Sequence, residues 1–147
     1  MKLLHLYKWI AGSMTDFTNQ FKDNETLYQQ ARAWWGHLES ISIFILLISV
    51  LLGIILAYCY YRPYNEMPGR HYKPKYWLIF MAITFIFTGV ITFLVEYILV
   101  EPRLQGSLGV EIKIAIGNAV YGTLLYFVTS VIWCNWLPTN AYRLLKF

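Results

Sequence analysis

The sequence is poor in charged residues, and this scarcity excludes an ordinary water-soluble domain. Only 14% of the 147 residues are Asp, Glu, Lys or Arg, whereas about a quarter of the residues of a typical soluble domain are charged. Hydrophobic residues make up 58% of the chain. Since so apolar a surface needs lipid as its solvent, we predict an all-α polytopic membrane protein without a sizeable water-soluble core.

Residue patterns that carry catalysis, metal binding or redox chemistry are also missing. The two cysteines, Cys59 and Cys134, form no CxxC pair, and the three histidines have no metal-ligand spacing. There is no HExxH, no GxSxG, no phosphate-binding loop and no nucleic-acid recognition motif. We therefore expect no enzymatic activity, no metal or other cofactor, no nucleic-acid partner and no small-molecule substrate.

What the chain does have is three apolar runs, at residues 41–60, 76–100 and 114–137. Each is long enough to cross a hydrocarbon layer of about 30 Å as a helix, and the segments between them are rich in proline and glycine. The pattern predicts an amphipathic N-terminal arm (1–40), a three-span membrane domain (41–137) and a short basic C-terminal tail (138–147).

The N-terminal arm has apolar residues at helical spacing and two helix-start signals. Ser13 and Asp16 have the spacing of a capping box, and Asp23–Asn24 provides the second start. Such an arm can lie in the membrane interface or dock on a partner. The spacing also leaves open a helix that continues without a break into the first span.

The charges differ between the two sides of the membrane that three spans create. The loop after the first span and the C-terminal tail together carry Arg62, Arg70, Lys73, Lys75, Arg143 and Lys146. The other side has fewer cations close to the spans. Because positively charged loops stay inside, we predict that the N-terminus is out and the C-terminus in. The small size and the lack of extramembrane domains favour an integral protein of the bacterial inner membrane.

Small residues recur on one face of the first span and of the third. The set is Ser49, Gly53 and Ala57 in the first span, and Ala115, Asn118, Ala119 and Gly122 in the third. Small side chains let helix backbones approach closely in lipid. Both faces are therefore predicted to be helix-packing faces, and they suggest association with further helices.

The middle span carries a polar stripe of Thr84, Thr88, Thr92 and Glu96, which recur every four residues. The stripe could line a hydrated pore in an oligomer, or it could be a packing seam that ends in an interfacial carboxylate. In the second case Glu96 could pair with Arg103 or Lys113. The amide of Asn118 is a candidate hydrogen-bond partner for Thr88 or Thr92.

Aromatic residues near the span ends have the positions of membrane-interface anchors. The candidates are Trp34, Trp35, Tyr60, Trp77, Trp133 and Trp136.

Three functions fit these patterns. The first is a non-enzymatic integral membrane subunit with a structural or assembly role in a larger complex or homo-oligomer. The second is a homo-oligomeric pore or ion channel lined by the middle span, and the third a membrane immunity or inhibitor protein. The expected partners are membrane lipids, further copies of the chain, or other membrane proteins.

Overall fold

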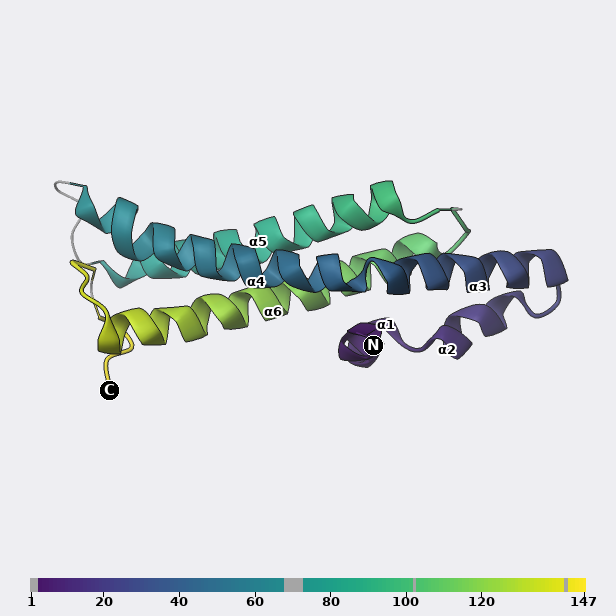
Figure 1. Ribbon diagram of the computed structural model, residues 1–147, viewed down its shortest axis with the longest axis horizontal. Helices are drawn as coiled ribbons and strands as arrows, with labels where there is room; N and C mark the ends of the chain where they lie inside the picture. The colour runs from purple at the N-terminus through teal and green to yellow at the C-terminus, as the bar shows by residue number, and fades with distance from the viewer. Residues whose placement is uncertain (1–2, 68–72, 102, 142) are drawn as a thin grey trace. The chain divides into compact units, whose positions relative to one another are not determined.

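The computed structural model describes residues 3–67, 73–101, 103–141 and 143–147, and these residues form helices and no strands (Figure 1). Arg70, one of the cations compared above, lies outside them. In chain order the elements are η1 (Leu3–Tyr7), α1 (Lys8–Ala11), α2 (Met14–Thr18), η2 (Asn19–Phe21), α3 (Glu25–Ser40), α4 (Ser42–Cys59), η3 (Tyr60–Tyr64), α5 (Pro74–Leu99) and α6 (Ser107–Trp136). The all-α prediction is confirmed.

Three helices are long and apolar enough to cross a membrane: Glu25–Tyr64, Pro74–Leu99 and Ser107–Trp136. The second begins and ends within two residues of the predicted span, whereas the third ends one residue before the predicted end but begins at Ser107, seven residues before the predicted start. Pro74 occupies the first helical position of α5, where its missing N–H costs no hydrogen bond. Gly106 precedes α6 with φ of 94°, a backbone conformation that residues with a side chain rarely adopt.

The first of the three begins at Glu25 rather than at residue 41, because α3 runs into α4. Asn24 caps the start of α3 by accepting hydrogen bonds from the backbone N–H groups of Thr26 and Leu27. At the junction the N–H of Ile41 donates to the carbonyl of His37 (3.2 Å), and Ile41 in turn accepts from Ile45 (3.1 Å). These bonds carry the helix through the junction. Of the alternatives for the arm, a helix that continues without a break into the first span therefore describes Glu25–Ser40.

The capping box predicted at Ser13 is confirmed. The backbone N–H of Asp16 donates to the Ser13 hydroxyl (3.3 Å), and the N–H of Ser13 donates to the Asp16 carboxylate (2.9 Å). The Ser13 hydroxyl also donates to this carboxylate (2.6 Å), and with the backbone N–H it holds the pKa of Asp16 below its ordinary value. Before it, Gly12 ends α1 with φ of 83°. Short helices thus replace the single helix that an uninterrupted periodicity would give.

The chain divides into two compact units. The first contains Met1–Leu47 and Gly89–Asn118, and the second Ile48–Thr88 and Ala119–Phe147. In the first unit, Trp34 and Leu38 of α3 are buried, and the ring of Phe17 lies 4.9 Å from that of Trp34. The arm therefore contributes its own side chains to a core.

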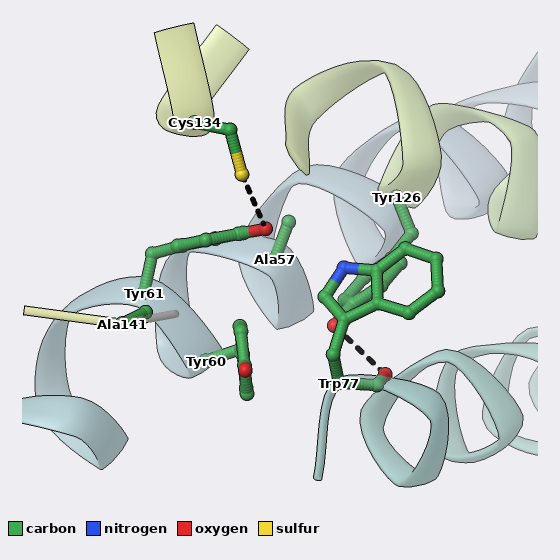
Figure 2. Close-up of a cluster of buried hydrophobic side chains, with 7 residues drawn as sticks. All are labelled: Ala57, Tyr60, Tyr61, Trp77, Tyr126, Cys134 and Ala141. Carbon is green, nitrogen blue, oxygen red and sulfur yellow. Dashed lines mark hydrogen bonds between the residues drawn. The ribbon is translucent and has the colours of Figure 1, made fainter. Parts of the chain in front are cut away.

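The second unit has a core of aromatic residues (Figure 2). Its buried members are Ala57, Tyr60, Tyr61, Trp77, Tyr126, Cys134 and Ala141. Polar atoms of the rings are paired: the Tyr126 hydroxyl donates to the carbonyl of Trp77 (3.2 Å), and the Trp77 indole donates to Ser130 (3.0 Å). These bonds join α5 to α6 within the unit.

Candidate functional site

The polar stripe of α5 is buried inside the chain. Thr84, Thr88, Thr92 and Glu96 have no exposed surface. The Thr84 hydroxyl donates to the carbonyl of Phe80 (2.8 Å), a bond to the preceding turn of its own helix. Thr88 packs against Gly122 of α6, so closely that a Cβ added at Gly122 would lie 2.7 Å from the Thr88 hydroxyl oxygen. Thr88 is thus engaged in helix packing within the second unit, and Thr84 in a hydrogen bond within α5.

Asn118 is the centre of a hydrogen-bond cluster in the first unit. Its side-chain amide donates to Thr92 of α5 (2.6 Å) and to the carbonyl of Ile45 in α4 (2.7 Å). Its amide oxygen accepts a bond from the hydroxyl of Tyr7 (2.8 Å). Thr92 is one of the two partners that the sequence suggests for Asn118. The cluster ties α4, α5, α6 and the N-terminal segment together at one residue.

Tyr7 is a residue that the sequence pattern alone does not single out. It is buried, and with Ile10 it lies against Gly117 of α6, where an added Cβ would come within 3.1 Å of the Tyr7 ring. Because Tyr7 and Asn118 are 111 positions apart, no helical periodicity connects them. Two sequence features could have indicated this contact: Gly117 stands next to the intramembrane amide of Asn118, and Tyr7 lies in an otherwise apolar helical face.

The small-residue faces also meet inside the chain. Gly53 of α4 faces the backbone of α6, where an added Cβ would lie 2.6 Å from the carbonyl oxygen of Gly122. The other members of the two faces are buried as well: Ser49, Ala57, Ala115 and Ala119. Contacts within the chain thus occupy both faces, and this removes the reason for assigning them to a partner.

Glu96 is buried, and so is a second acid, Glu111 of α6, which acts on it electrostatically. The possible pairings of Glu96 with Arg103 or Lys113 are not formed among the described residues. The guanidinium of Arg103 instead donates to the carbonyl of Tyr97 and lies over its ring. A sequence signal for Glu111 exists, because it extends the spacing of Ala115 and Ala119 by one helical turn.

The six aromatic anchor candidates fall into two groups. Trp34, Trp35, Tyr60 and Trp77 are buried in the two cores, whereas Trp133 is half-buried and Trp136 is 73% exposed. The ring of Trp133 stacks on Tyr61, with centroids 5.9 Å apart. The buried rings pack on other rings of the chain: Phe17 of α2 contacts Trp34, and Tyr126 of α6 contacts Trp77.

An open cavity of about 280 Å³ lies in the first unit. It is lined by Leu4, His5, Lys8, Gly12, Ser13, Met14, Thr15, Trp35 and Glu39. Within the described ranges, no three or more His, Cys, Asp or Glu side chains gather in a way that could hold a metal ion.

Comparisons with protein-family models, curated proteins and solved structures found no match to the chain. The class of protein is therefore described from the structure alone. The chain is an all-helical protein whose three long apolar helices are compatible with an integral membrane location.

Proposed function

We propose that the chain is a non-enzymatic integral membrane subunit with a structural or assembly role in a larger membrane complex or homo-oligomer. The observation that carries this proposal is how little of α5 the chain itself covers. Only 17% of the residues in the most apolar stretch of α5 are buried, against 44% for α6. The connections between the long helices are short, so the outward helix faces are the largest surface that this chain offers to a partner.

The outward face of α5 is the surface that we assign to association. Its exposed large side chains are Phe85, Ile86, Phe87, Val90, Leu94 and Ile98. The polar stripe is on the opposite, buried side of the helix, where Asn118 and Gly122 contact it. A pore shared between chains needs these threonines at a common surface, so their burial favours the assembly role over the pore.

The remaining parts of the proposal concern the membrane environment. We assign the chain to the bacterial inner membrane from its small size and lack of extramembrane domains, and we infer an N-terminus out and a C-terminus in from the basic residues on the loop and tail side. The segment Leu3–Phe21 would act as an amphipathic element at the membrane interface, where the exposed ring of Trp9 suits the headgroup region.

Photo-crosslinking from α5 tests the assembly role. We expect benzoylphenylalanine at Ile86 or Val90 to form adducts with protein in native membranes, because a partner helix covers this face. The matched control is the same probe at Leu51, an equally outward position on α4. Mass spectrometry of the adduct, after purification in mild detergent, distinguishes a second copy from another protein. Adducts with lipid alone at all three positions would refute the proposal.

A further inference from the structure

The open cavity of the first unit has both signs of charge on its wall. Lys8 of α1, Glu39 of α3 and His5 all line it. Its volume of about 280 Å³ is close to the lower end of ligand pockets in proteins, so it suits a group of a few heavy atoms rather than a large cofactor. Lys8 is exposed and Glu39 is half-buried, so a ligand can reach both charges.

The two charges of the cavity are not used up in ion pairs. Within the described ranges, neither Lys8 nor Glu39 takes part in one. Lys8 does attract the carboxylate of Asp16 electrostatically, but the hydrogen bonds to that carboxylate come from Ser13. The wall is therefore complementary to a small group that carries a negative and a positive charge of its own.

Apolar side chains accompany these charges. Leu4 and Trp35 line the same cavity, and both are buried. The short segment that carries Lys8 also exposes Leu6 and Trp9, which are 43% and 62% exposed. A segment with this mixture suits the headgroup region of a bilayer, where we place Leu3–Phe21. At that depth, the groups with two opposite charges are the headgroups of zwitterionic lipids.

We propose that this cavity binds the phosphoethanolamine headgroup of one membrane lipid. Lys8 pairs with the phosphate, to which His5 donates a further hydrogen bond, and the Glu39 carboxylate accepts hydrogen bonds from the primary ammonium group. A choline headgroup has no N–H to donate to Glu39, and a glycerol headgroup brings no positive charge. The site rests on the interfacial placement of Leu3–Phe21, and not on association through α5.

Native mass spectrometry of the purified full chain in mild detergent tests the site. Phosphatidylethanolamine, phosphatidylcholine and phosphatidylglycerol with identical acyl chains are titrated separately. We expect one phosphatidylethanolamine to bind about three- to fivefold more tightly than either of the others, as an ion pair that stays partly in water allows. Glu39→Gln should lose this preference, and Lys8→Gln should weaken the binding of phosphatidylethanolamine itself. Glu25→Gln and Lys22→Gln are the matched controls, because both residues are exposed in the same region and neither lines the cavity.

Three results would overturn the proposal. Equal binding of the three lipids would mean that they only surround the helices, and tighter binding of phosphatidylglycerol would mean a site for anions in which the carboxylate has no part. Displacement of the bound lipid by an equal concentration of soluble O-phosphoethanolamine would show that a soluble compound, and not a lipid, is the ligand.

The comparison of lipids on the wild-type chain decides the question even if a variant does not fold. It is also independent of crosslinking from α5, because the residues that line the cavity all belong to the arm and α3 of one chain. Failure of this site and failure of the assembly role are therefore distinguishable.

Discussion

Gly53→Leu is expected to abolish the folded second unit, because no side chain fits between α4 and α6 at this position. Even a Cβ atom would lie 2.6 Å from the carbonyl oxygen of Gly122 and 2.8 Å from the Cβ of Leu125. The first of these neighbours is backbone, so the helices must separate. Overpacking of this kind costs roughly 1–3 kcal/mol for Gly53→Ala, and the larger leucine should exceed that range. Reversible unfolding in sodium dodecyl sulfate, followed by circular dichroism, measures the change.

Gly36→Ala is the matched control for this prediction. Gly36 is also inside a long helix, but nothing lies within 4 Å of an added Cβ. Alanine there should leave stability unchanged or raise it by about 0.5–1 kcal/mol, since glycine is a poor helix former. If Gly53→Leu unfolds like the wild type and only loses a bound partner, the glycine face serves association and the contact within the chain is unimportant.

Asn118→Leu should produce the second large effect. The substitution removes the bonds to Thr92, to the carbonyl of Ile45 and from Tyr7. Hydrogen bonds between helices in lipid average about 0.6 kcal/mol and reach about 2 kcal/mol, so the three together should cost on the order of 2–4 kcal/mol. The free energy of unfolding in detergent is again the quantity to measure.

Two further variants show whether this loss comes from the cluster. Tyr7→Phe removes one of the three bonds and should cost about 0.5–1.5 kcal/mol. In the double variant Asn118→Leu/Tyr7→Phe, the loss of unfolding free energy should be less than the sum of the two single losses, because both changes break the bond between Tyr7 and Asn118. Thr123→Val is the control, since its hydroxyl donates to the carbonyl of Ala119 in its own helix. Additive losses, or an equal loss at Thr123, would contradict the cluster.

The long helices could be predicted because hydropathy is a property of each segment by itself. The apolar run at 76–100 predicts α5 to within two residues at each end, and the run at 114–137 predicts the end of α6 at Trp136 but not its start at Ser107. The start of the first helix could not be located in this way. The stretch Glu25–Ser40 is not apolar, and it stays helical because its cap at Asn24 and the burial of Trp34 and Leu38 support it.

The hydrogen-bond partners of the polar residues are harder to predict from the sequence. The spacing showed that Thr92 and Asn118 are intramembrane polar groups, but it could not show that Tyr7 closes the cluster from the far end of the chain. Burial of Glu111 likewise depends on how α6 packs and not on its own position outside the apolar run. A helical pattern gives the face of a residue, whereas its depth in the protein depends on contacts between distant segments.

These contacts change how the stripe on α5 is interpreted. Thr92 accepts a bond from Asn118 and Thr88 packs on Gly122, so both hold α5 to α6, whereas the Thr84 hydroxyl bonds within its own helix. The face that remains available is the apolar one on the other side of α5. The function that we propose therefore relies on what the chain contacts in the membrane, and not on a water path through it.

Cysteine accessibility along α5 tests this account most directly. In a background of Cys59→Ser and Cys134→Ala, cysteine is placed singly at Thr84, Thr88 and Thr92, and at Lys73 as an exposed control. The membranes are then treated with a water-soluble maleimide. The account predicts labelling at Lys73 and none at the three buried positions. Labelling of all three threonine positions would contradict it and would indicate a hydrated pore.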